Sequence, residues 1–166
     1  MKKMKFAIMP IVALVLVLTG ASCGSRTSTS TDTLPPRPST TETASKTEEK
    51  LFDNGNISGV QNGATKPTEF TFDKTRHVTK ITDYHWNKAT GSTPGTISLK
   101  DAKGKIYGPW QATGTDGQGG VKNAYWHVTP DIDLPAGTYT VIDSETSTWA
   151  QNSGSEGAGM TSVWGY

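Results

Sequence analysis

The chain has 166 residues, a formal net charge of +1 and a single cysteine, which excludes an internal disulfide. The charge balance lacks the basic excess that nucleic-acid binding requires, so we expect no nucleic-acid partner. Behind a non-globular N-terminal part, the length leaves room for one domain of about 100–120 residues, a usual size for a β-sandwich.

The first 22 residues have the layout of a secretory signal peptide. Three lysines precede an apolar run at 6–18, and small residues at 20–22 lead into Cys23. The apolar run is too short, and too closely followed by polar residues, to predict a membrane span. Removal of this segment with its three lysines would take the formal net charge from +1 to −2.

Gly-Ala-Ser-Cys at 20–23 resembles the lipobox of bacterial lipoproteins, with Gly20 where leucine is commonest. By this resemblance, Cys23 becomes the first residue after cleavage and is acylated on sulfur and nitrogen, and several acyl chains give stable membrane attachment. The alternative is an ordinary secreted protein with a chance cysteine. Because Gly24 rather than aspartate follows, inner-membrane retention is not signalled. We therefore expect a lipid-anchored cell-envelope protein, at the outer membrane if the host is Gram-negative.

Residues 23–50 form the lipidated cysteine and a predicted disordered tether. About half of this stretch is serine and threonine, with prolines at 35, 36 and 38, and it lacks the apolar residues needed to offset ordering entropy. As a flexible coil the tether spans roughly 30 Å. The Glu48-Glu49-Lys50 run at its end is predicted to start a short helix. The folded domain is predicted over residues 51–166.

Short β-type runs separated by turn signals fill residues 51–166, and no stretch has helical periodicity over three turns. The spacing predicts an all-β fold, an antiparallel β-sandwich of jelly-roll type. The predicted strands are 69–72, 77–86, 96–100, 106–112, 124–128 with an extension at 132–134, 139–143 and 161–164; residues 51–60 are predicted as an edge strand or entry loop.

Local details of three strands follow from their patterns. Ile97 and Leu99 alternate with polar residues, and Gly104 suits the turn of a hairpin that returns at 106–112. Pro109 predicts that the returning strand is an edge strand or carries a bulge. The imperfect alternation of 77–86 predicts a bulge near Thr79.

The Leu-Pro-Ala-Gly-Thr-Tyr-Thr-Val sequence at 134–141 resembles that of jelly-roll accessory domains of secreted bacterial proteins. The pre-peptidase C-terminal domains and the carbohydrate-binding modules are examples, and the resemblance covers about residues 65–143. It implies a sandwich fold and assigns no activity.

Catalytic motifs are lacking. There is no Gly-x-Ser-x-Gly elbow and no phosphate-binding loop, and the histidines lack metal-motif spacing, although His85 with His127 across strands stays open. Asp131 and Asp133 lie two residues apart, so both would point to the same side of a strand, as a pair of glycosidase carboxylates could. The simpler interpretation is that this side of the strand faces solvent. We therefore expect a protein that is not an enzyme, with a hydrolase as a minor alternative.

Calcium is the one cofactor that the sequence suggests. No lysine or arginine follows Lys122, and oxygen-rich loops without nearby cations suit Ca²⁺. The candidate ligands are Asp143, Glu145, Asn152 and Glu156. A solvated loop without metal is the alternative.

Five tryptophans are many for a small domain. We expect Trp86 and Trp126 in the core, and Trp110 and Trp149 at the surface, where with Tyr107 they would form a platform for a glycan or an envelope protein. The sequence thus predicts a non-catalytic, lipid-anchored binding module, with a purely structural envelope lipoprotein as the alternative.

Overall fold

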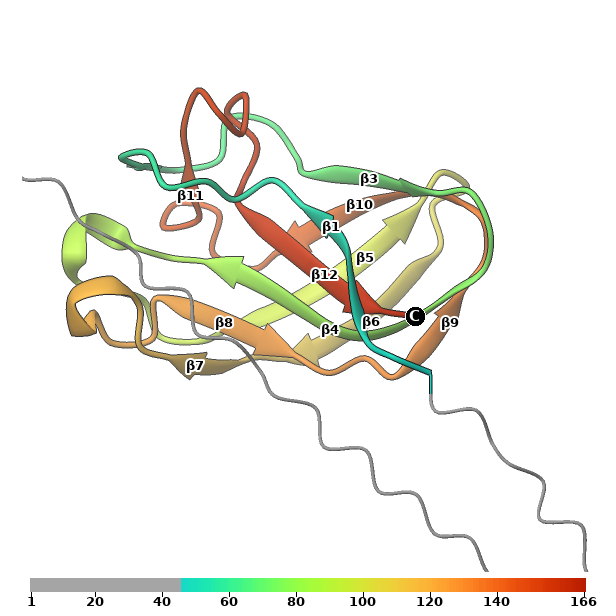
Figure 1. Cartoon of the computed structure of the whole chain (residues 1–166). Coiled ribbons are helices and arrows are strands. Elements are labelled where there is room, and N and C mark those ends of the chain that lie inside the picture. The colour runs from blue at the N-terminus through green and yellow to red at the C-terminus, as the bar shows by residue number, and fades with distance from the viewer. Residues whose placement is uncertain (1–45) are drawn as a thin grey trace, which may run out of the picture. The chain divides into compact units, whose positions relative to one another are not determined.

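The computed structural model describes residues 46–166, and these form an antiparallel β-sandwich (Figure 1). The predicted all-β fold is confirmed. The predicted signal peptide, Cys23 and most of the predicted tether lie outside the described residues. Within residues 46–166, no helix has the length and apolar composition that a bilayer crossing needs.

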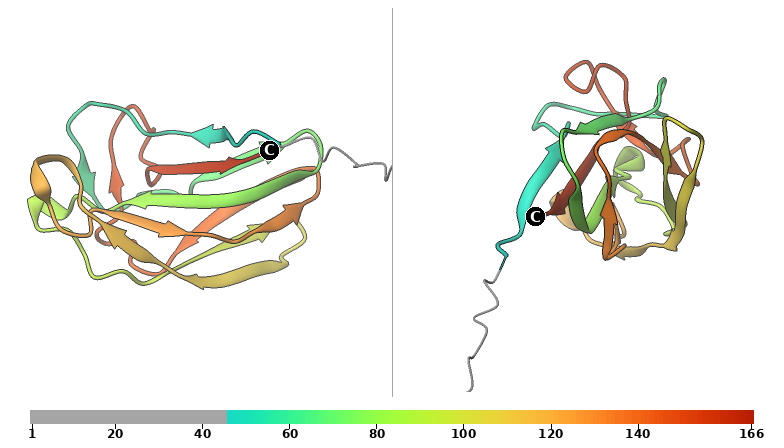
Figure 2. Two further views of the ribbon diagram at one scale, coloured as in Figure 1. Left: turned by 60° about the horizontal axis from the view of Figure 1, so that its bottom comes forward. Right: turned by 90° about the vertical axis from the view of Figure 1, so that its right-hand side faces the viewer.

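Two main sheets face each other (Figure 2). The first has the order β1-β12-β4-β8-β7, with β9 pairing to β4 beyond the end of β8, and the second has the order β3-β10-β5-β6. The bounds of the first sheet are β1 Glu49–Asp53, β12 Thr161–Gly165, β4 Arg76–Tyr84, β8 Tyr125–Val128, β7 Thr113–Thr115 and β9 Ile132–Leu134. Those of the second are β3 Glu69–Phe72, β10 Gly137–Asp143, β5 Thr96–Asp101 and β6 Ile106–Gln111.

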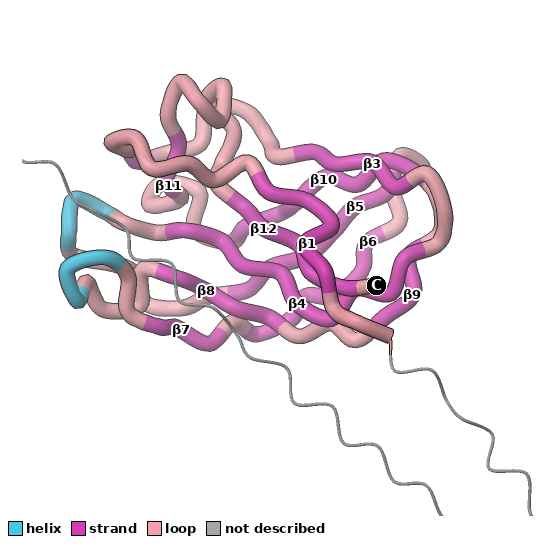
Figure 3. Tube along the Cα trace, viewed as in Figure 1, coloured by secondary structure: helices cyan, strands magenta, loops and turns pink. Residues whose placement is uncertain are grey.

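Shorter elements complete the domain. β2 (Gln61–Asn62) pairs with β11 (Ala150–Gln151), and two 3-10 turns, η1 (Asn87–Ala89) and η2 (Gln118–Gly120), lie in loops. Figure 3 shows that most of the chain between β10 and β12 is loop, interrupted by β11.

The core lies between the two main sheets and contains the inward side chains of both. Phe70 and Phe72 are buried on one face of β3, as their alternation predicts, and they contact Tyr139 of β10. Trp126 is fully buried on β8, as expected. Burial of apolar side chains of this size is the main driving force for association of the sheets.

The predicted hairpin is confirmed as β5 and β6. Asp101 closes its turn by accepting hydrogen bonds at Oδ1 from the N–H groups of Lys103 and Lys105, and Gly104 has φ +86°. β6 lies at the sheet edge, and its register with β5 shifts between Tyr107 and Trp110. The strand is thus both an edge strand and bulged, as the two alternatives for Pro109 predicted. Proline is tolerated at this position because its missing backbone N–H is not needed for a hydrogen bond to a neighbouring strand.

The predicted bulge of β4 is present at Thr79. Trp164 of β12 pairs with Lys80 and the next residue, Gly165, pairs with Val78, so Thr79 is the extra residue. The bulge lets both Val78 and Ile81 face the core although they are three residues apart.

The predicted helix start at 48–50 is wrong. Glu49 and Lys50 belong to β1, which pairs with β12 at the edge of the first sheet. The backbone ladder thus begins two residues before the predicted domain boundary at residue 51. Pairing with a neighbouring strand has overridden the weak helical preference of these charged residues.

Candidate ligand-binding site on the outer face of the first sheet

The end of β4 inverts the usual distribution of polar and aromatic side chains. After the bulge, the inward positions go to Ile81, Asp83 and His85, and Asp83 and His85 are both fully buried. Tyr84 and Trp86 alternate with them and stay partly exposed. The expectation that Trp86 lies in the core is therefore wrong, because the bulge assigns its side of the strand to the outer face.

Tyr125 of β8 lies directly opposite Tyr84 in the ladder. Their ring centroids are 4.9 Å apart, and the Tyr84 centroid is 6.5 Å from that of Trp86. Cross-strand aromatic pairs stabilise a sheet only modestly, about 0.2–1 kcal/mol. Three aromatic rings thus gather on the outer face of the first sheet and remain partly exposed.

These three rings line a groove with a cavity of about 240 Å³. Polar and aliphatic residues form its remaining walls, so it combines ring faces with amide and hydroxyl groups. The residues other than the rings are Asn56, Ile57, Ser58, Gly59, Val60 and Gln118. We call this hollow the aromatic groove.

One wall of the aromatic groove is held by a reciprocal amide pair. Asn56 donates to Oδ1 of Asn152 at 3.0 Å, and Asn152 donates back to Oδ1 of Asn56 at 2.8 Å. Asn152 also donates to the carbonyl of Gly59, and Asn152 is buried. These bonds hold the loop in place while Ile57 at its tip is 100% exposed.

Next to the groove, His127 connects two strands on the outer face. One ring nitrogen lies 2.9 Å from Oγ1 of Thr82, and the other lies 2.7 Å from Oγ1 of Thr115. Burial, with a smaller contribution from the charge of Lys80, lowers the pKa of His127. The neutral imidazole therefore donates to one threonine and accepts from the other, which fixes both hydroxyls beside the rings.

A buried polar cluster lies beneath the groove. His85 Nε2 is 3.1 Å from Oδ2 of Asp143, its Nδ1 is 2.8 Å from Oγ1 of Thr148, and its ring stacks on Trp126 at 3.7 Å. Asp83 accepts at Oδ1 from the Thr161 hydroxyl, while its Oδ2 has no donor among the described residues.

Burial, followed by the neighbouring Asp143 carboxylate, raises the pKa of Asp83 well above its ordinary value. A proton on Oδ2 of Asp83 gives this oxygen a hydrogen bond, because the protonated carboxyl can donate to the Asp143 carboxylate. The cluster is thus a satisfied, internal support for the strand that carries Tyr84 and Trp86.

The predicted platform of Tyr107, Trp110 and Trp149 does not form. Trp149 is 1% exposed and donates from Nε1 to the carbonyl of Met160 at 3.1 Å. Tyr107 and Trp110 lie on β6 of the second sheet, partly buried against the core. The prediction for Trp149 is wrong because the 144–160 loop folds back over the sandwich and encloses the ring.

The four predicted calcium ligands have separate partners. Asp143 contacts His85 inside the core, Glu145 accepts from Ser147, Asn152 pairs with Asn56, and Glu156 pairs with Lys66 at 3.0 Å. Within residues 46–166 the carboxylates do not form a cluster that could hold a metal ion. The structure therefore does not bring this set together.

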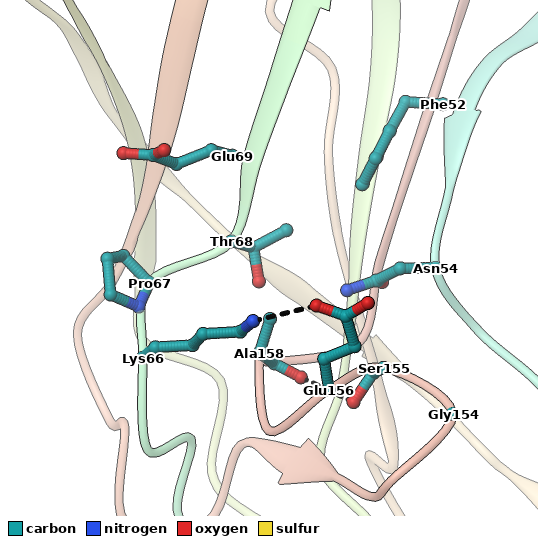
Figure 4. A pocket seen from close by; sticks show the side chains of 10 residues that line it. All are labelled: Phe52, Asn54, Lys66, Pro67, Thr68, Glu69, Gly154, Ser155, Glu156 and Ala158. Atoms are coloured by element: carbon teal, nitrogen blue, oxygen red, sulfur yellow. Dashed lines mark hydrogen bonds and ion pairs between the residues drawn. The ribbon is translucent and has the colours of Figure 1, made fainter.

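A second hollow lies between β1, the start of β3 and the loop before β12, with a volume of about 350 Å³ (Figure 4). The Lys66–Glu156 ion pair spans it, and the Thr68 hydroxyl at its floor donates to the carbonyl of Gly159. The Lys66 and Glu156 charges and the buried hydroxyl are thus already paired within the protein, and Glu69, the other charged residue of the lining, accepts from the Thr140 hydroxyl at 3.1 Å. For that reason we favour the aromatic groove as the site.

The candidate catalytic groups are also separated. Asp131 and Asp133 each accept from one ring nitrogen of His77 at 2.8 Å, so they form a surface ion-pair cluster. His85 faces the core while His127 faces outward, so the two cannot share a metal ion. Thr148, His85 and Asp143 form a hydrogen-bonded chain, but Thr148 lines neither the aromatic groove nor the hollow at Lys66 and Glu156.

Comparisons of the chain with protein-family models, with curated proteins and with solved structures found no match.

The groove residues Tyr84, Trp86 and Tyr125 were not predicted as a site. The signal was present: Tyr84 and Trp86 share one side of a strand whose other side carries Asp83 and His85. Once the bulge at Thr79 assigns Val78 and Ile81 to the core, strict alternation from Ile81 places both aromatic rings outside.

Proposed function

We propose that this protein is a lipid-anchored, non-catalytic carbohydrate-binding module of a bacterial cell envelope, and that the aromatic groove is its binding site. The observation that carries the proposal is the outward placement of Tyr84, Trp86 and Tyr125. Exposed aromatic rings stack on the apolar faces of sugar rings and supply large contact area at low entropic cost.

The surroundings of the rings favour a glycan over a protein partner. Amide and hydroxyl groups of Asn56, Ser58 and Gln118 line the groove beside the rings, and Thr82 and Thr115 add hydroxyls nearby. The buried centre of a protein-binding interface is typically more apolar than this groove. The lipid anchor is proposed from Cys23 and the lipobox resemblance, and it would hold the module at a membrane surface.

The test is a screen of the purified chain against a panel of neutral and acidic polysaccharides and immobilised oligosaccharides. We expect binding that Tyr84→Ala and Trp86→Ala each weaken at least about tenfold, because loss of a central aromatic contact costs at least ~1.4 kcal/mol. Tyr107→Ala, on the opposite sheet, is the matched control and should leave affinity unchanged. Binding that is insensitive to both groove variants, or no binding to any glycan, would refute the proposal.

A further inference from the structure

The outer face of the first sheet continues beyond the three rings of the aromatic groove to a fourth aromatic side chain. Trp164 of β12 pairs with Lys80 of β4 in the ladder, and Lys80 lies four residues before Tyr84 on the same face. At about 3.3 Å per residue, the two positions are about 13 Å apart along the strand. Thr82, His127 and Ser162 lie between them and expose hydroxyl and imidazole groups.

Among residues 46–166, Lys80 is the charged side chain on this face that forms no ion pair. The side chains that β1, β12, β4, β8 and β7 direct outward include the charged groups of Lys50, Asp53 and Lys80. His77 of β4 also faces outward, and it pairs with Asp131 and Asp133 at 2.8 Å. Lys50 and Asp53 form an ion pair at 2.6 Å and neutralise each other. Lys80 has no acidic side chain within 4.0 Å among residues 46–166, and its ammonium lies 4.8 Å from the centroid of the Trp164 ring.

The Trp164 ring fixes the position of Lys80. The ammonium groups of Lys50 and Lys80 lie 5.2 and 4.8 Å from its centroid, and the ring donates from Nε1 to Oγ of Ser162 at 3.3 Å. A cation held over an aromatic ring keeps its charge and its capacity to donate hydrogen bonds. Lys80 is thus a localised positive charge beside Trp164, at the end of a strip of hydroxyl groups that leads to the aromatic groove.

From this arrangement, and resting on the proposed carbohydrate-binding function, we propose that the ligand is an acidic polysaccharide. Its chain lies along β4, with one sugar ring stacked in the aromatic groove and the carboxylate of a neighbouring sugar paired with Lys80. The hydroxyls of Thr82 and Ser162 then face the hydroxyls of the chain between these two contacts. A neutral glycan would leave the ammonium of Lys80 without an anionic partner.

The experiment compares matched acidic and neutral polymers on the purified full-length chain. Polygalacturonate is paired with its methyl ester, and carboxymethylcellulose is paired with hydroxyethylcellulose. We expect tighter binding to the acidic member of at least one pair, and a preference that weakens as salt rises, because a surface ion pair is screened. Lys80→Gln should reduce affinity for the acidic polymer about fivefold and leave the neutral polymer unaffected.

Three control variants separate the possible outcomes. Lys80→Arg retains the charge and should retain the preference, whereas Lys100→Gln, an exposed lysine of β5, should have no effect. Tyr84→Ala should weaken binding to both members of a pair. Equal binding to both members, with sensitivity to Tyr84→Ala, would overturn the acidic-ligand inference and leave the proposed function standing; no binding to any polymer would overturn both.

Discussion

Replacement of Asp83 by asparagine should stabilise the protein at neutral pH. Asp83 is fully buried, and burial together with Asp143 raises the pKa of its carboxyl well above 3.8. The folded chain therefore retains a proton that the unfolded chain releases. An asparagine at this position has the same shape; it can accept from Thr161 through Oδ1 and donate to Asp143 through its amide nitrogen.

The sign of the effect follows from proton linkage. Between the ordinary pKa of aspartate and the raised pKa of Asp83, the folded state binds one more proton than the unfolded state, so stability falls as pH rises. Each pH unit in that window costs the wild-type protein about 1.4 kcal/mol. Because D83N has no such group, its advantage over the wild type should grow with pH across the window and then level off.

Urea unfolding followed by tryptophan fluorescence at several pH values from 4 to 8 measures this difference. The matched control is Asp73→Asn, which changes an exposed aspartate in the turn between β3 and β4 and should shift stability by less than about 0.5 kcal/mol at every pH. A constant difference between D83N and the wild type across pH would show that Asp83 holds no proton in the folded state. Strong destabilisation at neutral pH by D83N would contradict the hydrogen-bond assignment.

Three further predictions concern the core, the surface and the N-terminus. Trp149→Ala should lower the free energy of unfolding by about 3–5 kcal/mol, because it empties a site that is 1% exposed, whereas a ligand-binding surface role would leave urea unfolding nearly unchanged. The hydrogen bonds that His77 donates to Asp131 and Asp133, the Asp131 bond contributing most, raise the pKa of His77, so the stability from this cluster is complete below pH 6.5 and is lost as pH rises through the raised pKa. NMR titration should show a His77 pKa above 6.5 in the wild type and a return toward 6.5 when Asp131 and Asp133 are both replaced by asparagine. The same His77 pKa in both proteins would refute the role of the two aspartates. Cys23→Ser should move the mature protein from the membrane fraction to the soluble fraction, and unchanged fractionation would argue against a lipid anchor.

Local pattern was sufficient for most strands of the domain. The alternation of Phe70 and Phe72, the Ile97–Leu99 run with its Gly104 turn, and the spacing of Val78 and Ile81 each depend on neighbours a few residues apart. Strand periodicity, turn chemistry and the need for a bulge are properties of such short segments. The sheet order and the partner of each strand depend on contacts between segments far apart in sequence, and no local signal contains them.

The site depended on tertiary structure for a physical reason. Alternation divides a strand into two sets of side chains but does not say which set faces the core, so Trp86 could be assigned to either side until the register of β4 with β12 was known. Trp149 lies in a polar loop, and only the return of that loop over the sandwich buries its ring. The sequence by itself therefore determined the short strands and their turns, because these depend on neighbouring residues, and the tertiary structure decided which of the five tryptophans remain outside.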